Sequence, residues 1–121
     1  MQKKTYRIER VTELIQMELM SLLRLEASDP RFSKITISNV EISKDISIAK
    51  IFFTTQEEDA KALERALNKA SKYLRHLLSQ RVLLRNTPRL QFYYDKHEAR
   101  AQRLDFLIES AIKQDHADID Q

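Results

Sequence analysis

At 121 residues the sequence is long enough for one compact domain with a single core, and 42% of its residues are hydrophobic, as in ordinary globular proteins. It contains no cysteine and no glycine. This excludes disulfides, a thiolate nucleophile and the glycine-dependent loops that bind phosphates or dinucleotides. Every turn is therefore expected to use Asn, Asp, Ser, Thr or Pro.

The net charge is only +3, but basic and acidic segments alternate along the chain. Residues 1–10 and 61–89 are basic, whereas residues 11–60 and 95–121 are acidic. Such asymmetry is typical of a protein that binds a polyanion. No apolar run approaches the roughly 18 residues that span a bilayer, and no apolar segment follows the charged N-terminus, so we expect a cytoplasmic protein without membrane anchor or secretion signal.

The first half of the chain predicts a helix followed by a β-hairpin. Apolar residues at three- and four-residue spacing predict an amphipathic helix from Tyr6 to Glu26, which Ser28-Asp29-Pro30 ends. Alternating apolar residues predict a strand over 35–42, and the phase slip at Ser38-Asn39 indicates a bulge at Asn39. A polar turn at 43–45 leads to a second strand at 46–55, expected to pair antiparallel with the first.

The second half predicts a helix, a short strand and a last helix. Thr55-Gln56-Glu57-Glu58 fits a capping box that opens a helix, which Asn86-Thr87-Pro88 breaks. A third strand follows at 90–94. Asp95-Lys96-His97-Glu98 resembles a second capping box and opens a helix through 113, and we expect the acidic residues 114–121 to be disordered. The result is one α+β domain with a three-stranded sheet covered by helices.

The segment 61–89 carries eight Lys and Arg residues against the single acid Glu64. On a helical projection Arg65, Lys72 and His76 lie within about 60° of Lys69. The neighbouring stripe, predicted to pack on the sheet, contains Leu63, Ala70, Tyr73, Leu74 and Leu77. Like charges at this spacing repel without internal relief. We interpret the row as a polyanion-binding surface that Arg75, Arg81, Arg85 and Arg89 continue; a merely solvated face is the alternative.

A second group of cations, Lys3, Lys4, Arg7 and Arg10, gathers at the N-terminal end of the first helix. The helix dipole disfavours positive charge there by roughly 0.3–1 kcal/mol for each residue at low salt. A nucleic-acid contact explains this placement, and a disordered basic tip is the alternative.

The sequence contains no motif that indicates a catalytic site, a metal site or a cofactor site. His76, His97 and His116 are isolated, without the spacing of metal ligands. No nucleophilic triad or paired carboxylates appear, so we expect no enzyme and no cofactor. Asp45 reads as a turn former and Asp95 as an N-cap. The aromatic residues of the third strand, Phe92, Tyr93 and Tyr94, are interpreted as core, with base stacking as the alternative.

Several motifs together resemble the ribosome-binding factor A family. They are Asp29-Pro30-Arg31, Ser43-x-Asp45, Tyr73-Leu74-Arg75 and the pattern formed by Leu84, Arg85, Pro88, Leu90, Phe92 and Asp95. The resemblance covers about residues 4–110. It implies a type II KH-like fold, α-β-β-α-α-β, with an RNA-binding domain at 1–95 and a C-terminal helical extension at 96–113.

The resemblance also implies a bacterial ribosome biogenesis factor without catalytic activity. Such a protein binds the immature small (30S) subunit and 16S rRNA and promotes late rRNA maturation, notably in the cold. We expect a monomer without a small-molecule substrate. The candidate RNA-binding residues are Lys3, Lys4, Arg7, Arg10, Arg65, Lys69, Lys72, Arg75, His76, Arg81, Arg85 and Arg89. Two alternatives are a nucleoid-type protein that binds double-stranded DNA and a protein-interaction adaptor that uses the helix at 98–113.

KH domains clamp nucleotides with a G-x-x-G loop, which the family replaces with an Ala-x-Gly helix kink. The matching positions here are Ala70, Ser71 and Lys72, so lysine stands where the family has glycine. A kink would then depend on the Ser71 hydroxyl competing for backbone hydrogen bonds. Without the clamp, recognition is expected to rest on phosphates and RNA shape.

Overall fold

The computed structural model describes the backbone of residues 2–25 and 29–119 and the side chains of residues 7–25 and 29–113. Its elements are α1 (Gln2–Leu25), the short 3-10 helix η1 (Pro30–Lys34), β1 (Ile35–Ile42), β2 (Ile48–Thr55), α2 (Ala60–Lys69), α3 (Ser71–Arg81), β3 (Arg89–Tyr94) and α4 (Lys96–Ile119). Within these ranges no helix is both long and apolar enough to cross a bilayer. The order confirms the predicted α+β, type II KH-like fold with a C-terminal helix.

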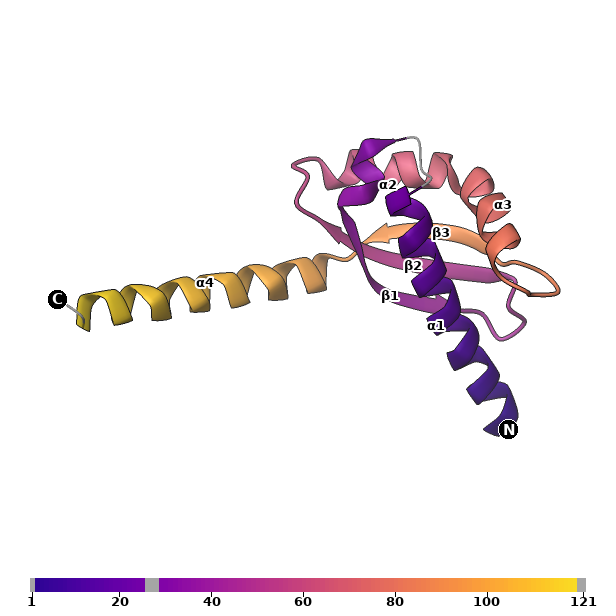
Figure 1. Ribbon diagram of the computed structural model, residues 1–121, viewed down its shortest axis with the longest axis horizontal. Helices are drawn as coiled ribbons and strands as arrows, with labels where there is room; N and C mark the ends of the chain where they lie inside the picture. The colour runs from indigo at the N-terminus through magenta and orange to yellow at the C-terminus, as the bar shows by residue number, and fades with distance from the viewer. Residues whose placement is uncertain (1, 26–28, 120–121) are drawn as a thin grey trace.

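The sheet has the order β1-β2-β3, with β1 and β2 antiparallel and β2 and β3 parallel. Alternate residues of each strand enter one core together with residues of α1, α2 and α3, while α4 runs away from the domain (Figure 1). The largest fully buried side chains are Ile15, Leu19, Leu22, Leu23, Ile51, Phe53, Leu63, Leu67, Leu74, Leu78, Pro88 and Phe92. Each apolar side chain buried this way contributes roughly 1.5–3 kcal/mol relative to exposure, so the domain is held by helices on one face of the sheet.

The predicted bulge in β1 is present, one residue earlier than expected. Pairing with β2 moves from Ile37↔Phe53 to Asn39↔Phe52, which makes Ser38 the extra residue. A bulge redirects the side chain that it carries. Here the Ser38 hydroxyl donates a 2.7 Å hydrogen bond to Oδ2 of Asp95, so the bulge ties β1 to the residue where α4 begins.

The turn between β1 and β2 corrects the expectation that polar residues or proline would make every turn. Ile46 has φ +58°, a left-handed conformation that costs a β-branched residue roughly 1–2 kcal/mol. Asp45 holds the turn, because its Oδ1 accepts from Ser43 Oγ at 2.9 Å and from Ser47 Oγ at 2.7 Å. The Ser47 bond, followed by the Ser43 bond, lowers the pKa of Asp45.

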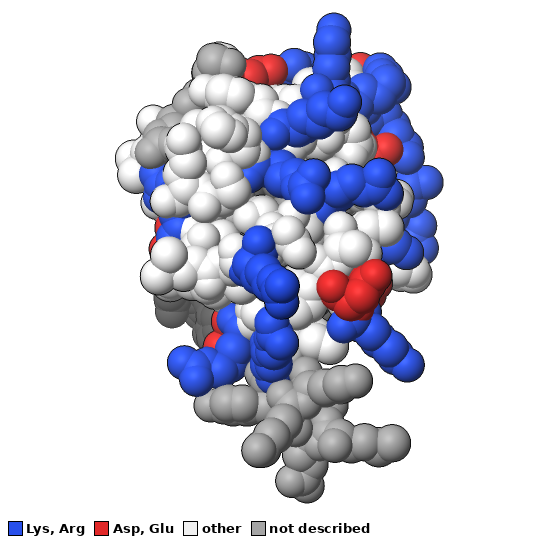
Figure 2. All heavy atoms as spheres, turned by 90° about the vertical axis from the view of Figure 1, so that its right-hand side faces the viewer, with Lys and Arg blue, Asp and Glu red and all other residues white. Residues whose placement is uncertain are grey.

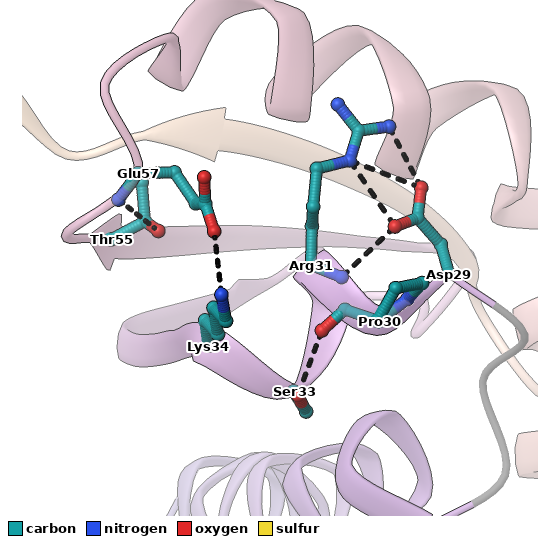
Figure 3. Close-up of polar contacts among 7 residues, drawn as sticks. All are labelled: Asp29, Pro30, Arg31, Ser33, Lys34, Thr55 and Glu57. Atoms are coloured by element: carbon teal, nitrogen blue, oxygen red, sulfur yellow. Dashed lines mark hydrogen bonds and ion pairs between the residues drawn. The ribbon is translucent and has the colours of Figure 1, made fainter.

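The Asp-Pro-Arg motif starts η1 (Figure 3). Asp29 accepts a 2.9 Å hydrogen bond from the backbone N–H of Arg31 and forms a 2.7 Å ion pair with its guanidinium. The side-chain hydrogen bond from Arg31 is the main cause that lowers the pKa of Asp29. The motif therefore fixes the start of η1, which carries Phe32 into the core.

The boundaries of the central helices differ from the prediction. The expected capping box at 55–58 is wrong, because Asp59 caps α2 by accepting from Ala62 N at 2.9 Å. Thr55 instead accepts from the N–H of Glu57 at 3.1 Å and closes a local turn (Figure 3). At the other end α3 stops at Arg81, where Val82 turns extended and buried, so burial ends the helix before Asn86-Thr87-Pro88 is reached.

Side chains of α2 satisfy the outer edge of β3. The Asn68 carboxamide accepts from Phe92 N at 2.8 Å and donates to Phe92 O at 2.9 Å. Glu64 Oε2 accepts from Tyr94 N at 2.7 Å. An unpaired strand edge invites pairing with other chains, and α2 prevents this by supplying the missing partners.

The predicted N-cap at Asp95 is confirmed. Its Oδ1 accepts from Glu98 N at 3.0 Å, while its own N–H donates to Phe53 O at 2.8 Å. The Glu98 bond, then the Ser38 hydroxyl, lowers the pKa of Asp95. The disorder expected for 114–121 remains a prediction, because the side chains of these residues and the backbone of 120–121 lie outside the described part.

We predict that Asn68→Ala lowers the free energy of unfolding by about 1–3 kcal/mol, because it strands the N–H and C=O of Phe92. Lys69→Ala, at the neighbouring exposed position, is the matched control and is expected to cost under about 0.5 kcal/mol. Urea denaturation of the two variants measures both values. Equal losses would mean that the Asn68 bonds contribute nothing to the sheet edge.

We predict that Asp95→Ala costs about 1 kcal/mol at pH 7 through the lost cap. Since folding lowers the pKa of Asp95 from 3.8, its stabilisation is present above that value and is lost as pH falls through the folded-state pKa. The difference between wild type and variant, from urea denaturation, is therefore expected to shrink below about pH 4. Asp105→Asn, at an exposed position on α4, is the control.

Candidate nucleic-acid interface

The helix is interrupted at Ala70, between α2 and α3. Ala70 has φ −87° and ψ 3°, in the bridge region that every residue type can adopt. Its N–H donates to Ala66 O at 3.0 Å and its carbonyl accepts from Leu74 N at 2.9 Å. Because no positive φ is required, the turn needs no glycine, and Lys72 lies inside α3. Among the described hydrogen bonds none involves the Ser71 hydroxyl, so the backbone of Ala70 carries the interruption.

Five of the predicted binding residues surround a set of adjoining hollows. We call these five residues the basic face: Lys72, Arg75, His76, Arg85 and Arg89. Lys72, His76 and Arg85 line a hollow of about 540 Å³ beside the loop 82–88. A second, of about 320 Å³, lies between α3 and β3, and a third, of about 340 Å³, lies against the β1–β2 turn. Arg75 lines all three and therefore stands at the centre.

Arg75 is held in place by the loop that follows its helix. Its Nε donates a 2.8 Å hydrogen bond to the carbonyl of Thr87, which is buried together with Pro88. A guanidinium has five N–H donors in a rigid fork. One bond to the loop therefore fixes the plane of the group, and its Nη atoms can meet a phosphate in the bidentate geometry that arginine favours.

The other predicted residues lie elsewhere. Arg81 is largely covered, and its Nη1 lies 3.5 Å from Glu18 Oε2 and 3.3 Å from Ser21 Oγ, so it joins α3 to α1. Arg65 and Lys69 are exposed on α2 but line none of the three hollows. On α1, Arg7 and Arg10 are exposed, and the side chains of Lys3 and Lys4 are outside the described residues.

One acidic side chain, Asp45, lines the third hollow, where its carboxylate accepts hydrogen bonds from Ser43 and Ser47. Lys72, Arg75, Arg85 and Arg89 form no ion pair within residues 7–25 and 29–113. Figure 2 looks onto the end of the molecule that carries α3 and the N-terminal end of α1, and Lys and Arg side chains outnumber isolated Asp and Glu there. Unrelieved positive charge of this kind raises the local concentration of a polyanion.

The helical projection misplaced Tyr73. It was assigned to the stripe that packs on the sheet, but its side chain is 54% exposed. On that projection the four buried leucines of α2 and α3, Leu63, Leu67, Leu74 and Leu78, lie about 120–180° from Lys69, whereas Tyr73 lies at about 40° and therefore outside the buried face. Leu83, in the loop after α3, is fully exposed. Both residues offer apolar surface near the basic face, and a stripe centred on the buried leucines is the signal that would have placed Tyr73 outside the core.

Acidic and histidine side chains give no sign of metal chemistry. Within the residues whose side chains are described, no group of three His, Cys, Asp or Glu residues could hold a metal ion. Glu64, the lone acid of the basic segment, accepts from the backbone of β3 and contacts Lys61 Nζ at 3.8 Å. The site is therefore a set of placed cations around shallow hollows.

Comparison with known proteins decides the family. The model of the family described as "Ribosome-binding factor A" matches residues 7–108. The chain belongs to the ribosome-binding factor A family. It is 47% identical over 113 residues to ribosome-binding factor A of Coxiella burnetii, covering 93% of this chain and 95% of the relative. The Azoarcus protein of that name is 44% identical over 117 residues, covering 95% and 93%.

Solved structures of ribosome-binding factor A agree with the fold. The solution structure of a putative member from Thermotoga maritima has a TM-score of 0.63 at 29% identity and covers 76% of this chain and 90% of its own. The crystal structure from Thermus thermophilus has a TM-score of 0.56 at 28% identity, covering 75% and 93%. A Thermus thermophilus model fitted into a cryo-EM map of its complex with the 30S subunit has a TM-score of 0.57 at 30% identity, covering 69% and 90%.

We predict that Arg75→Lys makes the amides of the loop 82–88 exchange hydrogen roughly tenfold faster, because lysine loses the Nε bond to the Thr87 carbonyl. Arg89→Lys, an exposed arginine on the same face, is the matched control and is expected to leave the loop unchanged. Hydrogen–deuterium exchange with mass spectrometry measures both. Equal protection in the two variants would mean that the loop does not depend on Arg75.

Proposed function

We propose that this protein is a ribosome biogenesis factor that binds the immature small ribosomal subunit through the basic face and contacts 16S rRNA. It promotes late maturation of that RNA without catalysing a reaction. The observation that carries the proposal is the cluster around Arg75, a guanidinium fixed by the Thr87 carbonyl among Lys72, Arg85 and Arg89. Membership of the ribosome-binding factor A family supports the choice of the small subunit as the target.

The chemistry of the basic face favours phosphates over bases. Lysine and arginine contacts to phosphates position a protein without reading sequence. The hollows are open and shallow, so they do not enclose a base as a clamp or an active-site pocket does. Specificity then arises from the spacing of phosphates in one folded RNA arrangement. The N-terminal cations of α1, including Arg7 and Arg10, extend the contact along the same end of the molecule.

The mechanism is selection among RNA conformations. A protein that binds one conformer more tightly shifts the equilibrium towards it by the difference in binding free energy. On an immature subunit the basic face would hold the rRNA arrangement that the last processing steps require. Alternative RNA pairings are longer-lived at low temperature, so the need for such a factor is greatest in the cold.

We predict that binding to purified small subunits weakens with salt, with a slope of log affinity against log salt of about 0.7–0.9 for each phosphate neutralised. Replacing Lys72, Arg85 and Arg89 with alanine is expected to reduce that slope by about 2–3. Fluorescence anisotropy at several salt concentrations measures the slopes. These residues are exposed, so the variant is expected to fold as the wild type does.

A variant with Lys50, Lys96 and Lys113 replaced by alanine is the matched control, because it removes the same charge from exposed positions outside the three hollows. Its slope is expected to equal that of wild type. In cells, the basic-face variant as the sole copy is expected to cause accumulation of precursor 16S rRNA. Equal slopes in both variants would show that the basic face does not meet RNA.

A further inference from the structure

α4 exposes an apolar stripe that nothing in the domain covers. Four large side chains share this side of the helix and are 50–57% exposed: Leu104, Leu107, Ile108 and Ile112. Every side chain from Arg100 to Lys113 is exposed. Single exposed apolar residues are common, but a contiguous row of this kind marks a binding surface.

The contacts at the start of α4 keep the stripe away from the protein's own core. Asp95 is bound to Ser38 of the β1 bulge and to the backbone of Phe53, so the helix leaves from a fixed point. It extends away from the sheet, on the opposite side of the molecule from α3 (Figure 1). Covering the stripe with the same domain would require breaking these bonds, so its occupant comes from outside.

The charge around the stripe decides what kind of occupant fits. Asp105 and Glu109 flank it on one side and Arg100 and Arg103 on the other, but from residue 105 onward the sequence has five acids against Lys113. Phosphates would be repelled by this end of the helix. A second copy is disfavoured as well, because a two-fold pairing centred on Ile108 brings Asp105 and Glu109 close to the same residues of the other copy.

We propose that the α4 stripe binds a basic protein, through an apolar groove lined by lysine and arginine. The apolar row inserts as i, i+3, i+4 anchors, and the surrounding acids pair with the cations of the partner. This inference extends the proposed function: on the small subunit, the basic face meets rRNA while α4 meets a ribosomal protein. The protein thus joins the two components of the subunit from opposite ends.

The test compares Leu107→Ser/Ile108→Ser with Gln102→Ser/Lys113→Ser, which places the same residue type on the other side of α4. The probes are RNA-free total protein from small subunits, immobilised, and protein-free 16S rRNA. The stripe variant is expected to lose roughly 30-fold in affinity for the protein fraction and to bind 16S rRNA as wild type does. The control variant is expected to match wild type on both probes.

Two outcomes would overturn the inference about α4. One is equal binding of the stripe variant and wild type to the protein fraction, or no binding by either. The other is a concentration-dependent dimer in sedimentation velocity that the stripe variant abolishes. The variant lacking Lys72, Arg85 and Arg89 separates the two proposals, because it is expected to lose affinity for 16S rRNA and to keep binding the protein fraction.

Discussion

The arrangement of this protein depends on the break in the helix at Ala70. Upstream of the break, α2 presents Asn68 and Glu64 to the edge of β3 and satisfies three backbone groups there. Downstream, α3 buries Leu74 and Leu78 and turns Arg75 towards the loop 82–88. The axes of α2 and α3 run in different directions on the two sides of the break (Figure 1). The break lets one segment close the sheet and the next build the basic face.

Much of this was predictable from the sequence, and what was missed has physical causes. Strand positions follow from alternation, and the bulge follows from the phase slip beside Ser38. A helix begins at the residue whose side chain accepts a hydrogen bond from the first free backbone N–H groups. Asp59 does this for α2, although Thr55 fits the sequence motif equally well. A turn that places a residue other than glycine at positive φ depends on hydrogen bonds from surrounding side chains. The left-handed Ile46 is tolerated because Ser43, Asp45 and Ser47 brace it, and that support is visible only in three dimensions.

The sequence shows which segment of the chain is basic, but it does not show how the side chains of that segment are arranged in space. The sequence does not distinguish Arg75 from the ten other Lys or Arg candidates, and only its contact with the Thr87 carbonyl makes it central. Arg81 was grouped with the binding residues although it faces Glu18 across the α1–α3 contact. Long side chains reach several ångströms from their Cα atoms, so a helical projection alone does not decide between an ion pair inside the protein and a contact with a ligand.

The use of acidic residues explains how the positive charge stays available. Asp29 is engaged at η1, Asp45 in the β1–β2 turn, Glu64 at the edge of β3 and Asp95 at the start of α4. Each of these carboxylates accepts a hydrogen bond from a backbone N–H, which for Asp45 is that of Ser47, so its charge is used within the fold. Most remaining acids lie on α1, in the β2–α2 loop or along α4, and none of those with described side chains lines the three hollows. The fold thus separates charge by using nearby acids for structural contacts, and a protein of net charge +3 carries around the hollows a cluster of cations without ion-pair partners in the described part of the chain, at the opposite end of the molecule from α4 (Figure 1).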